Sequence, residues 1–203
     1  IDPEKIYVVS VMPCLAKKYE AARPELTNEE LSNVDAVIST RELGKLIRES
    51  GINFHELPEE EFDNPMGEST GASVIFGATG GVIEAAVRTA YEWITNETLD
   101  KIDFTELRGL EGIREASVKV GDMDLKIGIA NGLGNARKLL NKIRNGEAEY
   151  HAIEIMACPG GCINGGGQPL INHDWAVIQK RAEAIYEEDK EKPIRQSHKN
   201  PQI

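Results

Sequence analysis

The chain has 203 residues, enough to bury a substantial core in one large domain or in two small lobes. Hydrophobic residues at 40% and charged residues at 28% are typical of a globular protein. The net charge of −11, without a cluster of Lys and Arg, argues against nucleic acid or an anionic membrane as a partner. No apolar run reaches the length of a membrane span and no signal-peptide pattern is present. We therefore expect a cytoplasmic protein, with the periplasm as the open alternative.

The first part of the sequence predicts strands that alternate with helices. Residues 6–12 are β-branched and apolar on both faces, which predicts a buried strand. Residues 36–39 predict a second strand, and Ser39 with Glu42 forms a capping box at the start of a helix over 41–50. Two strand–helix pairs in succession indicate an α/β fold, with parallel strands flanked by helices.

Two stretches of this half are less regular. Thr27 and Glu30 form another capping-box pattern, which predicts a short helix between the two strands. Residues 53–70 combine acidic side chains with Pro and Gly, and they predict an acidic surface loop.

A glycine-rich segment, Phe76-Gly-Ala-Thr-Gly-Gly81, precedes a helix that we expect to reach about Trp93. The start of such a helix can bind a phosphate. The segment lacks the Lys and Ser/Thr of a P-loop and the phasing of a dinucleotide-binding loop. Close approach of the backbone to a buried part of the protein is the favoured interpretation.

The second half predicts a hairpin and then a strand between two helices. Residues 113–131 predict two strands joined at Gly121-Asp122. The elements expected after the hairpin are a helix over 136–144, a strand over 150–156, an amphipathic helix over 174–188 and an extended C-terminal arm over 189–203.

The strand over 150–156 leads into a segment with two cysteines and five glycines: Glu154-Ile-Met-Ala-Cys158-Pro-Gly-Gly-Cys162-Ile-Asn-Gly-Gly-Gly-Gln-Pro169. Glycine allows the backbone to approach another group closely and to adopt positive φ. Two soft thiolates in such a backbone favour an iron–sulfur cluster. Plain loop cysteines and a disulfide that closes a short loop are the alternatives. A zinc site needs about four ligands, and only His151 and His173 flank the segment.

The third cysteine, Cys14, also follows a predicted strand. Three cysteines exclude a fully paired disulfide framework and are one short of the four ligands of a [4Fe–4S] cluster. In one interpretation, Lys17 and Glu20 are an ordinary surface pair three residues apart. In the other, Cys14 joins Cys158 and Cys162, and Lys17 points at an anionic ligand of a cofactor.

Two long motifs together resemble a known family. Met12-Pro-Cys-x-x-Lys-x-x-Glu20 and Met156-Ala-Cys-Pro-Gly-Gly-Cys-x-x-Gly-Gly-Gly-Gln-Pro169 are similar to the second and third signature motifs of the [FeFe]-hydrogenases. The resemblance extends over the whole chain, including the segment over 76–81 and the helix that contains Asn135-Ala-Arg-Lys-Leu-Leu140.

The resemblance implies an iron-only hydrogenase catalytic domain, which has two α/β lobes with the cluster between them. The chain would hold the second lobe and part of the first. Such enzymes reversibly reduce protons to dihydrogen at the H-cluster, a [4Fe–4S] unit joined through a cysteine to a di-iron unit with CO, cyanide and a bridging dithiolate. The electrons come from ferredoxin, a nicotinamide-linked partner, or additional iron–sulfur domains or subunits.

The resemblance also assigns roles to individual residues. Cys14, Cys158 and Cys162 match ligands of the [4Fe–4S] unit, and Cys162 matches the bridge to the di-iron unit. Lys17 matches the residue that hydrogen-bonds a cyanide. The residues that match the wall of the pocket are Met12, Phe76, Gly77 and Met156, and Pro13 matches a residue next to the same cyanide.

The family's first motif, T-S-C-C-P, with the fourth cluster ligand and the proton-relaying cysteine, does not occur in the chain. We therefore expect residues 1–203 to be a fragment of the catalytic domain or one part of a split subunit, inactive alone. The alternative is a hydrogenase-like protein of cytosolic iron–sulfur assembly, which carries a [4Fe–4S] cluster and has no hydrogen chemistry. A sensory relative of the hydrogenases is a third possibility.

Overall fold

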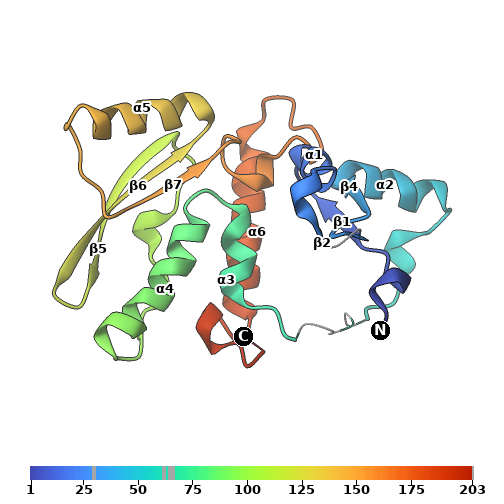
Figure 1. Ribbon diagram of the computed structural model, residues 1–203, viewed down its shortest axis with the longest axis horizontal. Helices are drawn as coiled ribbons and strands as arrows, with labels where there is room; N and C mark the ends of the chain where they lie inside the picture. Colours follow the sequence, from blue (N-terminus) through green and yellow to red (C-terminus); the bar gives the residue numbers. More distant parts are fainter. Residues whose placement is uncertain (29–30, 61–62, 64–66, 203) are drawn as a thin grey trace. The chain divides into compact units, whose positions relative to one another are not determined.

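The computed structural model describes residues 1–28, 31–60, 63 and 67–202 (Figure 1). The chain divides into two compact units of mixed α/β structure. Unit 1 is Ile1–Phe62 with Gly165–Asn172, and unit 2 is Asp63–Asn164 with His173–Ile203. In the part of the chain that is described, no helix is both long and apolar enough to cross a membrane.

Unit 1 contains the expected parallel strand pair. Strand β1 (Val9–Met12) pairs in parallel with β4 (Ala36–Ser39) in register Val9 to Ala36. Helix α1 (Ala16–Ala21) follows β1, and α2 (Thr40–Glu49) follows β4. The predicted pair of strand 36–39 and its following helix, and the parallel direction of the two strands, are therefore confirmed. After the first strand the helix is α1, which was not predicted from the sequence.

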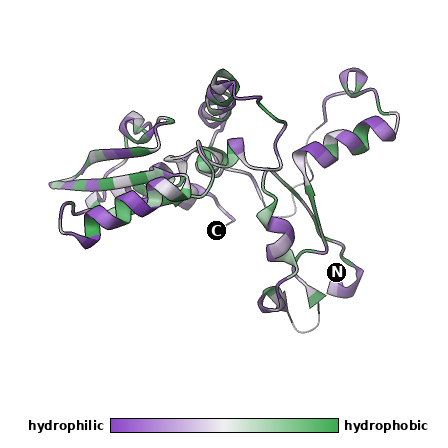
Figure 2. Ribbon diagram, turned by 90° about the horizontal axis from the view of Figure 1, so that it is seen from above, coloured by the Kyte–Doolittle hydropathy of each residue, from purple (hydrophilic) through white to green (hydrophobic). Residues whose placement is uncertain are grey.

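The capping box of α2 forms as its sequence predicts. Ser39 Oγ accepts from Glu42 N at 3.2 Å, and Glu42 Oε2 accepts from Ser39 N at 2.7 Å. A hydrogen bond from Lys18, together with those from Ser39, lowers the pKa of Glu42 to about 2. The helix ends before Gly51, whose φ of +68° suits the position after a helix. Hydrophobic and hydrophilic residues alternate along α2 (Figure 2).

Two expectations for unit 1 are wrong. Thr27 lies in β2 (Thr27–Asn28), which pairs antiparallel with β3 (Leu31–Ser32), so no helix begins at Thr27; its predicted capping partner Glu30 lies outside the described residues. Thr27 Oγ1 instead donates to Pro24 O at 2.9 Å, because a short hydroxyl side chain can bond to its own turn. Strand β1 is also less buried than predicted, since β4 is its single strand partner within the described part of unit 1 and Val9 and Val11 remain 49% and 45% exposed.

Unit 2 is built on a three-stranded sheet in the order β5–β6–β7. The strands are β5 (Ile113–Val120), β6 (Met123–Asn131) and β7 (Ala152–Met156). The first two form the predicted hairpin with a two-residue turn in which Gly121 has a φ of +57°. Strand β7 runs parallel to β6 and leads toward Cys158.

Helices cover both faces of this sheet. One face packs with α4 (Gly81–Thr95) and the following loop, and its buried residues are Val87, Leu99, Phe104, Leu107, Val118, Val120, Ile127 and Ile129. The other face packs with α5 (Leu133–Arg144) through Ala130, Ala136 and Leu139. The remaining helices of unit 2 are α3 (Gly71–Val74) and α6 (Trp175–Glu191).

The C-terminal segment is more ordered than its composition suggests. Helix α6 continues to Glu191, so Asp189 lies inside the helix and is fully buried. Beyond the helix, Gln196 is also buried, and its side chain donates to Arg88 O at 3.2 Å. Part of the predicted acidic loop, residues 61–62 and 64–66, lies outside the described residues.

A buried ionic cluster joins α4, α6 and the C-terminal segment. Arg88, which is completely buried, donates to Glu84 and to Asp189, each at 2.8 Å. Arg195 contacts Asp189 at 2.6 Å and Asp103 at 2.7 Å. Arg108 completes the cluster with contacts to Glu84 and Asp103. Three cations therefore neutralise three carboxylates in the interior of unit 2.

Replacing Arg88 with Met should destabilise unit 2 by about 3–5 kcal/mol, because the buried carboxylates of Glu84 and Asp189 each lose one of their two guanidinium partners. The free energy of unfolding from a urea titration measures this loss. Lys142→Met is the control, since Lys142 forms an exposed pair with Glu115 and its loss should leave the unfolding midpoint unchanged. Equal effects of the two substitutions would contradict the importance assigned to the cluster.

The same cluster predicts a loss of stability in acid. Burial alone would raise the pKa of Asp103, but hydrogen bonds from Arg195 and Arg108 outweigh it and lower the pKa below its ordinary value. The carboxylate therefore contributes stability that is complete above the ordinary pKa of about 3.9 and is lost as pH falls toward the lower folded-state pKa. Asp103→Asn should flatten the decline of unfolding free energy as the pH falls below about 4. A decline as steep as that of the parent chain would show that other groups cause it.

Candidate metal centre

Two of the three cysteines lie on one tight turn of unit 2. Directly after β7, Gly161 N donates to Cys158 O at 3.0 Å. Pro159 and Gly160 occupy the two central positions of this turn, and Gly160 has a φ of +82°. These features define a type II β-turn. Cys162 follows and begins a short 3₁₀ helix that ends at Asn164. The turn, which we call the cysteine turn (residues 158–162), presents Cys158 half-buried and Cys162 exposed.

The glycine-rich segment before α4 packs directly on the cysteine turn. Thr79 N donates to Gly160 O at 3.2 Å. A Cβ atom at Gly161, whose φ is +98°, would lie 2.7 Å from Thr79 N and 2.8 Å from Gly77 O. The close backbone approach that the sequence favoured for residues 76–81 is therefore present, and the partner is the cysteine turn.

The N-terminus of α4 is occupied by a carboxylate of the protein. Glu154, on β7, accepts from Gly80 N at 2.5 Å and from Ile83 N at 2.9 Å. The first N–H groups of a helix have no partner within the helix, and a carboxylate is favoured there. The phosphate interpretation is not supported, because Glu154 already bonds the N–H groups that would bind the anion.

The third cysteine belongs to unit 1. Cys14 is half-buried and follows β1. The glycines that follow the cysteine turn also belong to unit 1: Gly167 N donates to Pro13 O at 2.8 Å, and Gly167 O accepts from Arg41 N at 3.1 Å. A Cβ atom at Gly167 would lie 2.8 Å from Met12 O. The second half of the long cysteine motif therefore packs on the residues directly before Cys14.

Lys17 lies on α1, three residues after Cys14. Its Nζ atom is 2.5 Å from Glu20 Oε1, and both side chains are close to half exposed. Met12, Lys17 and Glu20 all line a mainly apolar cavity of about 280 Å³ within unit 1. Lys17 thus forms the pair of the surface interpretation and faces a cavity that it shares with Met12.

The thiols fit an iron–sulfur cluster in chemical type. None of the three cysteines forms a disulfide with another. In neither unit do the described residues bring three His, Cys, Asp or Glu side chains together as a metal-binding group. Unit 2 contains two of the thiols and unit 1 contains the third. Thiolates are soft donors of the type that binds iron.

Two polar residues that lie near the cysteine turn were not identified from the sequence. Asn131, at the end of β6, accepts from Gly160 N at 2.9 Å, and Glu154 binds the start of α4 as described above. Each is a buried polar residue within an apolar strand. A polar residue in an otherwise apolar strand could have identified both residues from the sequence, since a buried polar group needs a hydrogen-bond partner.

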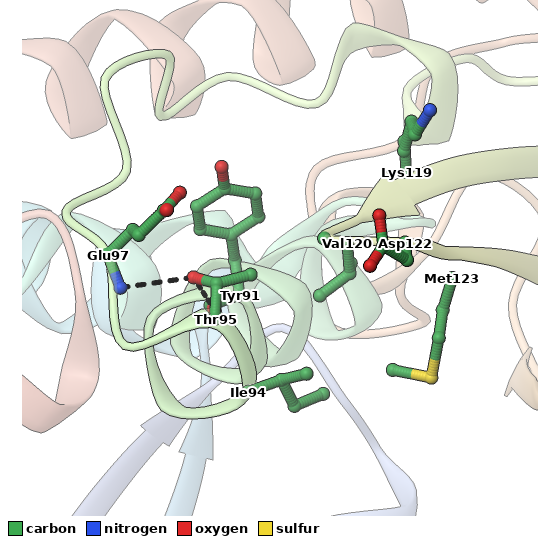
Figure 3. Close-up of a pocket in the computed structure, with 9 residues that line it drawn as sticks. Tyr91, Ile94, Thr95, Glu97, Lys119, Val120, Asp122 and Met123 are labelled. Carbon is green, nitrogen blue, oxygen red and sulfur yellow. Dashed lines mark hydrogen bonds between the residues drawn. The ribbon is translucent and has the colours of Figure 1, made fainter.

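A wide groove of unit 2 lies away from the cysteine turn. It is an open groove of about 790 Å³ between the end of α4 and the β5–β6 turn (Figure 3). Thr95 lies beside it and donates to Tyr91 O at 2.7 Å, while its oxygen accepts from Glu97 N at 3.2 Å. The groove is lined by Lys119, Asp122 and Met123 from the hairpin. None of its lining residues belongs to the cysteine turn or to the glycine-rich segment, so its size does not mark it as the metal centre.

Two family models match the chain. Residues 1–166 match the model described as iron only hydrogenase large subunit, C-terminal domain. Residues 176–203 match the model described as iron hydrogenase small subunit.

The chain is also similar to individual proteins of known sequence or structure. The NADP-reducing hydrogenase subunit HndD of Solidesulfovibrio fructosivorans is 59% identical over 203 residues, which is 100% of this chain and 34% of that protein. A solved variant of [FeFe]-hydrogenase HydA1 from Chlamydomonas reinhardtii has 42% sequence identity and a TM-score of 0.79, covering 100% of this chain and 58% of that one. Cytosolic iron-sulfur assembly component 3 of Mus musculus is 34% identical over 173 residues, 83% of this chain and 36% of that protein. The chain thus spans about a third of the length of these two curated relatives.

Gly161→Ala tests the packing of the cysteine turn. The left-handed backbone and the overlap with the glycine-rich segment should together lower the free energy of unfolding of unit 2 by at least about 2 kcal/mol. Urea unfolding measures the effect. Gly134→Ala is the control, because Gly134 lies in α5 with nothing within 4 Å of its Cβ position. It should stabilise the helix by roughly 0.5–1 kcal/mol. A tolerated Gly161→Ala would show that the close approach does not constrain the turn.

Proposed function

Because this chain belongs to the iron-only hydrogenase family, we propose that it forms part of the catalytic domain of an enzyme that reversibly reduces protons to dihydrogen. The observation that supports this most strongly is the hydrogen bond from Gly167 N to Pro13 O. It joins the segment after the cysteine turn to the residues directly before Cys14. Two signature motifs that lie about 150 residues apart in the sequence thus meet through their backbones.

We propose that Cys14, Cys158 and Cys162 are iron ligands of a [4Fe–4S] cluster, and that Cys162 also holds the di-iron unit. When bound, this H-cluster supplies the electron and proton chemistry of hydrogen turnover. The protein's part is to fix the thiolates. The type II turn and the contacts of Gly160 and Gly161 hold Cys158 and Cys162 in one backbone conformation. Ligands that are fixed in advance avoid ordering cost when the metal binds.

The proposal gives Lys17 the role of a cation for an anionic ligand of the di-iron unit. Its pairing with Glu20 holds the half-exposed side chain at a mainly apolar cavity that Met12 also lines, and an ammonium group there can form a charge-assisted hydrogen bond to an anion. The residues proposed to wall the pocket and to limit the access of water are Met12, Pro13, Phe76, Gly77 and Met156.

The wider protein would receive electrons from ferredoxin, a nicotinamide-linked partner, or further iron–sulfur domains or subunits. The second candidate is an iron–sulfur assembly protein that holds a [4Fe–4S] cluster and no di-iron unit, which the 34% identity to component 3 supports. The higher identity of 59% to a hydrogenase subunit and the complete Met12-to-Glu20 motif favour the hydrogenase.

The test compares Cys158→Ser with Cys162→Ser in the whole protein, matured anaerobically. Cys162→Ser should remove the tether of the di-iron unit, so infrared bands from iron-bound CO and cyanide and all hydrogen evolution should be lost. Cys158→Ser should retain an altered [4Fe–4S] cluster, because a serine oxygen can replace one thiolate at a single iron. Iron and sulfide analysis with infrared spectroscopy of both variants provides the measurement.

The parent protein supplies the control. If it binds iron and sulfide but shows no CO or cyanide bands, the assembly-type function is correct and the hydrogenase proposal fails. If both serine variants evolve hydrogen at nearly the parent rate, the cysteines are ordinary loop residues and the proposed ligand set is wrong.

A further inference from the structure

Asn131 is a buried residue that touches the cysteine turn from a different strand. It is the last residue of β6 and is 2% exposed. Its side-chain Oδ1 accepts from Gly160 N at 2.9 Å, although the two residues lie 29 positions apart. The donor is the backbone N–H of the residue midway between Cys158 and Cys162.

The hydrogen-bond partners of the Asn131 side-chain amide fix its orientation. Its Nδ2 donates to Glu111 O at 2.8 Å, and a carbonyl can only accept. Gly160 N–H can only donate, so Oδ1 must face the turn. The backbone of Asn131 is held as well, because its N donates to Gly112 O at 3.0 Å and its O accepts from Asn135 Nδ2 at 2.9 Å. The acceptor is therefore presented from a rigid position.

The cysteine turn depends on such outside contacts. Between its two cysteines it contains Pro159 and two glycines, and glycine has little conformational preference of its own. Within the turn, Gly161 N donates to Cys158 O. The two polar groups of Gly160 are bound from elsewhere, the N–H by Asn131 and the C=O by Thr79 N. Together they fix the plane of the peptides that separate the two thiols.

We propose that Asn131 is a positioning residue that sets the conformation of the cysteine turn and, through it, the geometry of the two thiolates toward iron. The part concerning iron rests on the proposed function. The part concerning the turn does not, because it follows from contacts within unit 2 alone.

The first arm of the test uses the 203-residue chain without iron. In Asn131→Leu, which keeps the branched side-chain skeleton and removes the acceptor, the Gly160 amide should exchange with solvent about tenfold faster, the factor that corresponds to a typical single hydrogen bond. In Asn131→Asp, which keeps an acceptor, protection should be retained. Amide exchange followed by NMR reports both. Val118→Ala is the control, since Val118 is buried in β5 and belongs to the core on the α4 face of the sheet.

The second arm uses the whole protein loaded with iron and sulfide. Asn131→Leu should shift the EPR spectrum and the midpoint potential of the [4Fe–4S] cluster, while Val118→Ala, which lowers stability only, should leave both unchanged. An unchanged Gly160 exchange rate in Asn131→Leu would overturn the positioning role. Normal EPR in a variant with fast Gly160 exchange would overturn its consequence for iron. A parent protein that takes up no cluster would refute the proposed function, and the first arm would still decide the role of Asn131 in the turn.

Discussion

The arrangement of unit 2 depends on how the N–H groups at the start of α4 are satisfied. Gly80 is buried, and the first N–H groups of a helix have no acceptor within the helix, so another part of the chain must supply one. Glu154 does this from β7, four residues before Cys158. A single carboxylate thereby ties the glycine-rich segment to the strand that leads into the cysteine turn. The glycines at 80 and 81 are required at this junction, because a Cβ atom there would overlap the carbonyl of Leu107 or of Ile75.

Two kinds of contact hold the segments of unit 2, and they have different consequences. The apolar core between the sheet and α4 stabilises the unit through buried area, and this contribution depends little on the orientation of the side chains. The core therefore tolerates substitutions that conserve volume. The ionic cluster around Arg88 is directional, since a planar guanidinium group bonds acceptors only at fixed positions around it. A buried cluster of this kind contributes modest net stability, because desolvation opposes the attraction. We infer that its value lies in fixing where α6 and the C-terminal segment pack on α4.

The elements that the sequence predicted correctly are those with complete local signals. Gly121 supplies the positive φ that a two-residue hairpin turn needs, and the strands on either side have matching patterns. Ser39 and Glu42 lie three residues apart and form both bonds of the capping box. The pattern at Thr27 has the same form and fails, because Thr27 pairs in a strand with Ser32 and its hydroxyl bonds to Pro24. A capping pattern identifies a helix only where the following residues also favour one.

The sequence by itself determined the α/β class, the family through its two cysteine motifs, and the soft-donor chemistry of the three thiols, because these follow from residue identity and short spacing. Only the tertiary structure decided which polar groups meet. The bonds from Gly160 to Asn131, from Gly80 to Glu154 and from Arg88 to Asp189 join residues that lie 29, 74 and 101 positions apart. No local rule selects among the many acceptors of a chain of this length. The choice is made when the sheet and its helices pack and each buried donor must find an acceptor within reach.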